Sequence, residues 1–177
     1  MLNLALDTAT GAGRFALAEG DRVLVYRPVN IQGSCADALL PVVEQMLAEA
    51  GRCRTELTGV GVTTGPGSFT GVRIGVATAK GLAWALGCEL VAVTTLEAMA
   101  AALLAEADPA VEMAVPVLDA RRGELFAAVY RRRRSWVEAV LAPAAARPDD
   151  WWARLSAALD DPGVPAYGGD GTTLLLG

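Results

Sequence analysis

The amino-acid sequence predicts an α/β protein built from two related lobes, the second shorter than the first. From the N-terminus we expect three strands, a helix, a strand, a helix, a strand and a helix. A β-meander followed by β–α alternation is typical of a mixed sheet with helices packed on its faces. A second series of strands begins after Asp108-Pro109. We therefore expect a first lobe over residues 1–107 and a second lobe over residues 108–177.

The elements of the first lobe follow from its hydrophobic periodicity. Short apolar runs bounded by turn residues predict strands, and apolar positions three and four residues apart predict helices. Gly20-Asp21 is expected as a hairpin turn, and Gly51 and Gly87 each end a helix. Strands are expected over residues 2–6, 14–19, 22–29, 57–63 and 89–93, and helices over residues 36–50, 70–86 and 96–107.

The second lobe repeats the opening of the first. In each lobe an apolar strand delivers an aspartate, Asp7 or Asp119, into a polar glycine-containing turn that opens a hairpin. The two aspartates are 112 residues apart, which is far beyond the period of a solenoid and indicates duplication of a lobe. Strands are expected over residues 113–118, 124–130, 136–141 and 164–167, and a helix over residues 149–159.

The composition excludes several kinds of active site. The 177 residues contain no histidine, so Ser-His-Asp and Cys-His arrangements and His-Glu-x-x-His zinc sites are impossible within them. Three cysteines form no Cys-x-x-Cys pair, which favours a reducing cytoplasm over a disulfide framework. The first residues lack the basic region of a signal peptide, and no uncharged apolar run approaches the ~20 residues of a membrane span. We therefore expect a cytoplasmic protein without a membrane segment.

Charge is distributed unevenly along the chain. The net charge is −5, yet residues 121–134 carry six arginines and one glutamate. An acidic protein lacks the general basic surface of an autonomous nucleic-acid binder. The run Arg131, Arg132, Arg133 and Arg134 is therefore either a solvated hairpin turn or a direct contact for RNA. Trp136 follows it, and as a strand residue it is expected to be packed.

Five polar or charged residues are candidates for ligand binding. Asp7 and Asp119 stand at the carboxyl ends of strands, where ligands bind in open α/β sheets, although each could instead complete an Asx-turn. Thr8 follows the first of these. Ser68 and Arg73 lie where a glycine-rich turn opens a helix, a place where backbone N–H groups can bind an anion. The lysine of a Walker A loop is missing from this turn.

Small side chains recur every four residues along the helix expected over residues 70–86. Gly71, Gly75, Ala79 and Ala83 form this stripe. Glycine inside a helix costs ~1 kcal/mol relative to alanine, so close packing must compensate for it. The stripe can pack on the protein's own sheet or on another chain, and periodicity alone does not separate the two.

Several motifs together resemble the bacterial TsaB (YeaZ) family. They are Leu4-Ala5-Leu6-Asp7-Thr8-Ala9-Thr10, Leu39-Leu40-Pro41, Gly65-Pro66-Gly67-Ser68-Phe69-Thr70-Gly71-Val72-Arg73-Ile74-Gly75, Ala79-Lys80-Gly81-Leu82-Ala83 and Asp119-Ala120-Arg121-Arg122-Gly123-Glu124. The resemblance implies an actin/Hsp70-type, ribonuclease H-like fold. It also implies a role in making threonylcarbamoyladenosine beside the anticodon of tRNA.

The resemblance further implies a non-catalytic subunit without catalytic residues or a metal site. Its paralogous partner TsaD would carry the chemistry, with a histidine-containing metal site, and the ATPase TsaE would join the complex. ATP and metal are therefore expected on the partner subunits, and a homodimer in isolation is left open. The surface that pairs with TsaD would be helical, and the small-residue stripe points to Gly71, Val72, Gly75, Val76, Ala79, Leu82 and Ala83.

This chain departs from the family pattern in two places. Cys35-Ala36-Asp37 stands where family members usually carry His-Ser-Glu, and the second lobe is shorter than usual. The alternative function is a stand-alone enzyme, either an actin-like ATPase or a glycoprotease-like hydrolase of the peptidase M22 type. The missing histidine and the missing phosphate-binding lysine both argue against that alternative.

Overall fold

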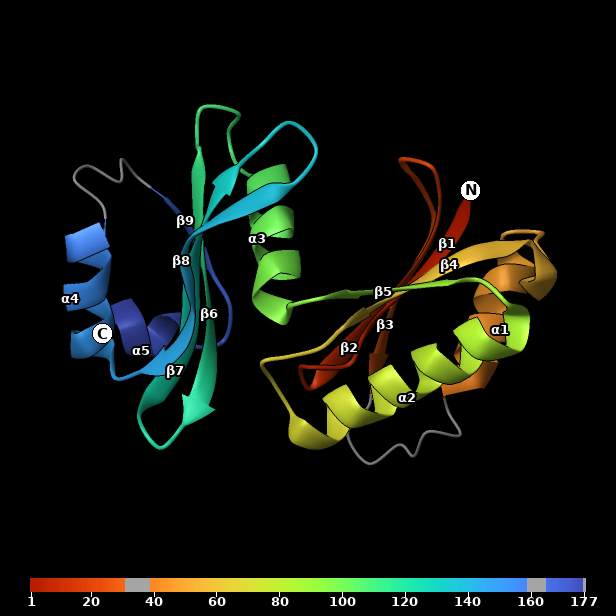
Figure 1. The fold of residues 1–177 in the computed structure, drawn as a ribbon, viewed down its shortest axis with the longest axis horizontal. Coiled ribbons are helices and arrows are strands. Elements are labelled where there is room, and N and C mark those ends of the chain that lie inside the picture. Colours follow the sequence, from red (N-terminus) through yellow and green to blue (C-terminus); the bar gives the residue numbers. More distant parts are fainter. Residues whose placement is uncertain (31–38, 159–164, 177) are drawn as a thin grey trace. The chain divides into compact units, whose positions relative to one another are not determined.

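The structure is a computed structural model that describes residues 1–30, 39–158 and 165–176. The chain divides into two compact units, Met1–Thr95 and Leu96–Gly177. Each unit has a sheet and a core of its own (Figure 1). The division lies one helix earlier than the expected boundary between residues 107 and 108, because the helix Thr95–Glu106 packs into the core of the second unit.

The first unit contains a five-stranded mixed sheet with the order β3-β2-β1-β4-β5. Strands β1, β2 and β3 form an antiparallel meander, whereas β4 runs parallel to β1 and β5 runs parallel to β4. The elements are β1 (Leu2–Asp7), β2 (Ala12–Glu19), β3 (Arg22–Asn30), α1 (Leu39–Glu49), a 3₁₀ turn (Arg54–Glu56), β4 (Leu57–Thr63), α2 (Phe69–Leu86) and β5 (Glu89–Val93).

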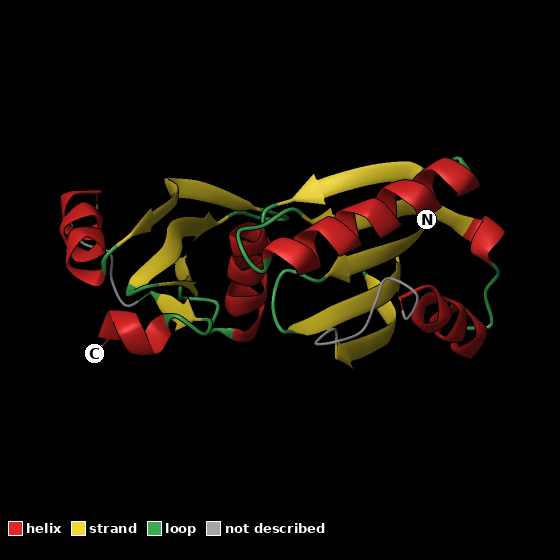
Figure 2. Ribbon diagram, turned by 90° about the horizontal axis from the view of Figure 1, so that it is seen from below, coloured by secondary structure: helices red, strands yellow, loops and turns green. Residues whose placement is uncertain are grey.

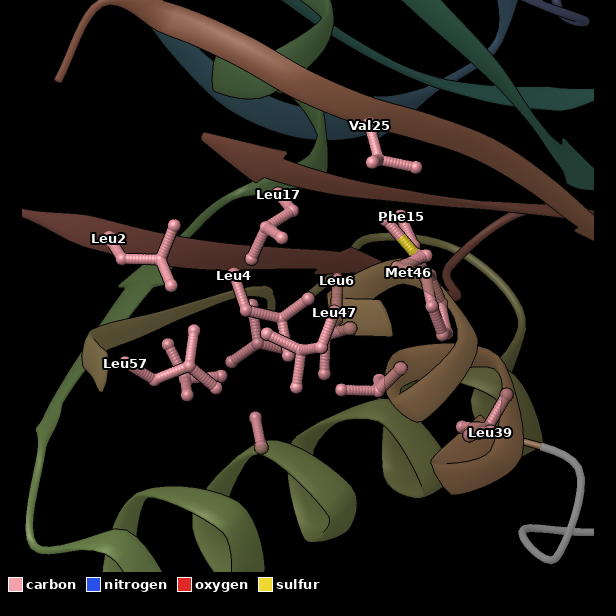
Figure 3. Close-up of a cluster of buried hydrophobic side chains, with 14 of the residues drawn as sticks. Leu2, Leu4, Leu6, Phe15, Leu17, Val25, Leu39, Met46, Leu47 and Leu57 are labelled. Atoms are coloured by element: carbon pink, nitrogen blue, oxygen red, sulfur yellow. The ribbon is translucent and has the colours of Figure 1, made fainter. Parts of the chain in front are cut away.

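Strict alternation in β1 places the core of the first unit on one face of its sheet. Leu2, Leu4 and Leu6 are buried, while the residues between them are exposed. Leu4 lies beside Leu17 of β2 and Val60 of β4 in the register of the sheet. Helices α1 and α2 both contribute side chains to this cluster, so they cover the same face (Figure 3).

The second unit contains a four-stranded sheet with the order β8-β7-β6-β9. An antiparallel meander is again extended by a parallel strand, which repeats the first four positions of the other sheet. Within the described residues this sheet has four strands and that of the first unit has five, and the shared strand order shows a duplicated α/β arrangement, as expected. The elements are α3 (Thr95–Glu106), β6 (Met113–Arg121), β7 (Glu124–Arg132), β8 (Val137–Ala146), α4 (Pro148–Ala158), β9 (Ala166–Gly168) and α5 (Thr172–Leu176).

Helices cover both faces of the second sheet. Met113, Val115 and Val117 of β6 pack with α4 and α5, whereas Ala114 and Leu118 pack with α3. Figures 1 and 2 show α3 on one side of this sheet and α4 and α5 on the other. This arrangement explains the continuous apolar sequence of β6, because a strand buried on both faces has no polar alternation.

Candidate functional site

Asp7 lies where β1 and β4 end, next to Thr63. Its Oδ1 accepts hydrogen bonds from the Ala9 N–H at 3.0 Å and from the Thr63 hydroxyl at 2.7 Å. The Arg14 guanidinium lies 3.9 Å from Oδ2, and the Asp7 side chain is 21% exposed. A hydrogen bond to the N–H two residues on is the signature of an Asx-turn. The carboxylate is therefore engaged in closing the turn after β1.

Thr8 follows Asp7 and is fully buried beneath α2. Its hydroxyl donates a hydrogen bond to the Gly71 carbonyl at 2.8 Å. A Cβ on Gly71 would lie 2.0 Å from the Thr8 carbonyl oxygen, and a Cβ on Gly75 would lie 2.1 Å from the Thr8 Oγ1. Real side chains do not approach so closely, so both positions require glycine. The glycines of α2 allow the turn after β1 to pack directly against the helix.

Ser68 is the N-cap of α2. Its hydroxyl accepts a hydrogen bond from the Gly71 N–H, and its own N–H donates to the Ala9 carbonyl at 2.6 Å. A Cβ on Gly67 would lie 2.3 Å from the same Ala9 oxygen. The backbone groups at the N-terminus of α2 are thus partly hydrogen-bonded by the turn between β1 and β2. Asp7, Thr8 and Ser68 lie together at this junction, and these hydrogen bonds are all to residues of the first unit.

The residues of α2 that were expected at the partner interface do not form an exposed surface in the structure. Gly71, Gly75, Ala79 and Ala83 are buried, and Val72, Val76 and Leu82 are half-buried. Val76 and Leu82 pack against the core of the first unit. The close approach of the turn after β1 therefore explains Gly71 and Gly75, and burial within the first unit explains Ala79 and Ala83.

The opposite side of α2, which we call the outer face, is exposed. Its residues are Phe69, Arg73, Ala77, Lys80, Gly81 and Trp84. Phe69 is 70% exposed and Trp84 is 89% exposed, and the Arg73 guanidinium lies 3.9 Å from the centre of the Phe69 ring. A Cβ on Gly81 would meet nothing within 4 Å, so nothing in the described structure requires glycine there. Helical periodicity could have indicated this face, because Trp84 lies on the side opposite Gly75.

Asp119 lies two residues before the end of β6, where the pairing with β7 shifts register, whereas Asp7 is the last residue of β1. The Asp119 Oδ1 accepts a hydrogen bond from the Arg121 N–H at 2.7 Å, and its Oδ2 lies 3.3 Å from the Arg121 Nη1. The Asp119 N–H in turn donates to Asp170 at 2.9 Å. The two candidate aspartates belong to different units: Asp7 closes the turn after β1, and Asp119 bonds to Arg121 at the register shift that precedes the turn after β6.

The four consecutive arginines have different surroundings. Arg132 donates to the carbonyls of Leu104 and Val111 at 2.6 and 3.0 Å, and so ties β7 to the end of α3. Arg133 pairs with Glu138. Within the described residues, no hydrogen bond or ion pair is formed by the side chains of Arg131 and Arg134.

Trp136 is 60% exposed, so the expectation that it is packed is wrong. It immediately precedes β8, where Val137 is buried. Side chains alternate between the two faces of a strand, so Trp136 lies on the face opposite the buried Val137, and that face is uncovered at this position. Alternation from Val137 is the sequence signal that could have identified this exposed indole.

The described residues, 1–30, 39–158 and 165–176, contain neither a metal-binding cluster nor a membrane-spanning helix. No group of three Cys, Asp or Glu side chains among them is arranged to hold a metal ion. Their helices are too short or too polar to cross a lipid bilayer. Cys35-Ala36-Asp37, the departure from the family pattern, lies outside the described residues.

Comparison of the sequence with known families and proteins gives consistent matches. The model of TsaD, tRNA N6-adenosine threonylcarbamoyltransferase, matches residues 28–160. The tRNA threonylcarbamoyladenosine biosynthesis protein TsaB of Bacillus subtilis (strain 168) is 32% identical over 151 residues, covering 85% of this chain and 64% of that protein. TsaB of Escherichia coli (strain K12) is 34% identical over 146 residues, covering 79% of this chain and 62% of that protein. The chain thus spans less than two-thirds of the length of these curated relatives.

Two solved structures share the fold over most of this chain. YeaZ from Pseudomonas aeruginosa superposes with a TM-score of 0.73 at 32% identity, covering 84% of this chain and 68% of that one. An uncharacterized protein with similarity to peptidase YEAZ, also from Pseudomonas aeruginosa, superposes with a TM-score of 0.76 at 27% identity. That match covers 96% of this chain and 83% of the other.

Proposed function

The chain belongs to the TsaB (YeaZ) family, and from this premise we propose that it is a non-catalytic subunit in the synthesis of threonylcarbamoyladenosine in tRNA. In this proposal it binds the transferase TsaD through the outer face of α2. It takes no cofactor of its own, and ATP and metal are bound by the partner subunits. The TsaB names of its relatives support the pathway, and the exposed surface of α2 supports the mode of action.

The observation that carries the proposed interface is a pair of exposed aromatic side chains with small residues between them, beside the exposed cations Arg73 and Lys80. Trp84 and Phe69 expose large apolar side chains, while Ala77 and Gly81 between them have little or no side chain. Exposed aromatic residues are typical anchors of protein interfaces, and small residues let a second helix approach closely. Glycine at an exposed position in a helix costs ~1 kcal/mol relative to alanine. A partner helix lying over Gly81 would account for it.

The chemistry of the described residues supports a subunit without catalytic activity. The 177 residues contain no histidine, the usual acid–base catalyst and metal ligand near neutral pH. Of the acidic candidates, Asp7 is held by Ala9 and Thr63, and Asp119 is held by its own turn. These engagements favour the scaffold over a stand-alone ATPase or glycoprotease-like hydrolase.

The binding arm of the test measures mass by light scattering for this chain alone, for TsaD alone and for their mixture. We expect a heteromer, and we expect Ala77→Arg to abolish it because a long charged side chain would separate the two helices. Ala153→Arg, an equivalent change at an exposed position of α4, is the matched control and should leave the heteromer intact. Circular dichroism must show that both variants remain folded. Absence of a heteromer with the unmodified chain would overturn the proposal.

The activity arm measures threonylcarbamoyladenosine formed in tRNA. We expect no product and no ATP hydrolysis from this chain alone, and product when TsaD and TsaE are added. Ala77→Arg should lower product formation in parallel with the loss of heteromer, whereas Ala153→Arg should not. Modification of tRNA by this chain alone would contradict a non-catalytic role.

A further inference from the structure

The hairpin that joins β7 to β8 presents a distinctive set of side chains, which we call the basic tip: Arg131, Arg133, Arg134 and Trp136. In the register of the two strands, Arg131 lies opposite Glu138 and Arg132 lies opposite Val137. The Arg133 N–H donates to the Trp136 carbonyl at 2.9 Å, which extends the hairpin by one further pair. Opposed residues share a face and successive pairs alternate, so Arg131, Arg133 and Trp136 lie on one face while Arg132 lies on the other.

The contacts of the tip separate structural charges from available ones. Arg132, on the inner face, is held by backbone carbonyls at the end of α3. Arg133 is neutralised by Glu138, which lies diagonally across from it. Within the described residues, the guanidinium groups of Arg131 and Arg134 have no hydrogen-bonding or ionic partner. The tip therefore carries two uncompensated positive charges beside an exposed indole.

An exposed tryptophan beside free guanidinium groups suits one kind of ligand better than others. Single-stranded nucleic acid is bound by stacking its bases on aromatic side chains while basic residues follow the phosphates. Residues 131–138 contain four arginines and one glutamate, an excess of positive charge in an otherwise acidic chain. The outer face of α2 differs, because its exposed aromatic residues flank small side chains and suit a helix of a protein partner. The outer face also carries two cations, Arg73 and Lys80, so the two exposed aromatic surfaces are distinguished by the small side chains at Ala77 and Gly81, which the tip lacks.

We propose that the basic tip is an RNA-contacting element, in which Trp136 stacks on an unpaired base and Arg131 and Arg134 bind the adjacent phosphates. The identification of that RNA as tRNA rests on the proposed function, whereas the chemistry of the contact rests on the tip alone. The contact supplies affinity and position, because neither stacking nor phosphate binding selects a particular sequence.

The test measures binding of tRNA and of a short single-stranded RNA to the full chain, alone and mixed with TsaD, over a series of salt concentrations. Trp136→Ala should weaken binding by about 5- to 150-fold without changing the salt dependence, and Trp136→Phe should retain part of the affinity. Arg131→Gln and Arg134→Gln should each reduce the slope of log affinity against log salt by about 0.7 to 0.9. Arg147→Gln, which removes one exposed charge just beyond the opposite end of β8, is the matched control and should retain affinity and slope.

Each outcome assigns the tip to one role. Unchanged affinity and slope in the Trp136 and arginine variants would overturn the inference, even if TsaD binds and tRNA is modified. Loss of heteromer formation with unchanged RNA binding would assign the tip to a protein contact and would also overturn it. RNA binding that depends on the tip in a chain that forms no heteromer with TsaD would support the inference while refuting the proposed function.

Discussion

The turn after β1 and the turn after β6 are each preceded by an aspartate with the same hydrogen-bond pattern, but the two turns differ in burial. In both, an aspartate accepts a hydrogen bond from the N–H two residues on, Ala9 after Asp7 and Arg121 after Asp119. In the first unit Thr8 and Ala9 are buried under α2, whereas in the second unit Arg121, Arg122 and Gly123 are all exposed. The shared aspartate is therefore a feature of the duplicated hairpin. It does not by itself mark a ligand site, and the covering helix is what differs.

The largest effect is expected where the first turn meets α2. Gly71→Ala would place a Cβ 2.0 Å from the Thr8 carbonyl oxygen, so helix and strand must separate. We expect a loss of about 3 kcal/mol or more in the free energy of unfolding, because the Cβ is fixed by the helix backbone and the atom that it meets is a main-chain oxygen. Urea denaturation followed by circular dichroism measures it.

Gly81→Ala, on the outer face of the same helix, is the control for Gly71→Ala. A Cβ there meets nothing within 4 Å, and alanine is the better helix former. We expect this variant to be as stable as the parent or up to ~1 kcal/mol more stable. Equal losses from the two substitutions would show that the close packing on Thr8 is not what requires Gly71.

The two aspartates should differ next. Asp7→Ala removes an acceptor from Ala9 and from the buried Thr63 hydroxyl, and a hydrogen bond to a charged group contributes ~2 kcal/mol. Asp119→Ala removes one hydrogen bond and an ion pair to the exposed Arg121, and pairs with an exposed partner contribute ~1 kcal/mol or less. We expect urea midpoints to fall more for Asp7→Ala. The reverse order would refute the comparison of a buried turn with an open one.

The comparison also shows what the sequence could predict. Alternation in β1 and the repeat of Asp7 at Asp119 sufficed for the strands and the duplication, because both depend on local pattern. The place of α3 did not follow, since Leu96, Ala100 and Leu104 form an apolar face that could pack on either sheet. Periodicity likewise places Gly71 and Gly75 on one face of the helix but does not specify what packs against that face. The residue that does so is Thr8, which is distant in the sequence.

For the arginine-rich hairpin, the sequence predicts the excess of positive charge but not which arginines are paired. Four arginines in a row predict a basic hairpin, yet the commitment of Arg132 to α3 and of Arg133 to Glu138 depends on contacts between distant residues. The prediction that Trp136 is packed is wrong because membership of a strand does not by itself specify which face is covered. Trp136 directly precedes β8, and the burial of Val137 places the indole on the opposite, uncovered face.

A smaller effect tests how the first turn is attached to α2. Thr8→Val keeps the size and branching of the buried side chain but removes the hydroxyl that donates to the Gly71 carbonyl. We expect a loss of about 1 kcal/mol, the usual contribution of one neutral hydrogen bond. Thr10→Val, which removes an exposed hydroxyl from the same turn, should cost less. Hydrogen exchange at the amides of α2 provides a second measurement, because a weakened attachment should speed exchange there.

The smallest expected effect has the opposite sign and concerns the second turn. Arg122 and Gly123 have φ values of 57° and 77° between the paired residues Arg121 and Glu124. Positive φ at both central residues is the type I′ hairpin turn, which favours Asn-Gly. Arg122→Asn should therefore raise the free energy of unfolding by about 0.5 to 1 kcal/mol, measured by urea denaturation, since arginine is strained in this conformation. We also expect tRNA modification with TsaD and TsaE to be unchanged if Arg122 only closes the hairpin. Lower modification by the more stable variant would show that the Arg122 side chain is used in function.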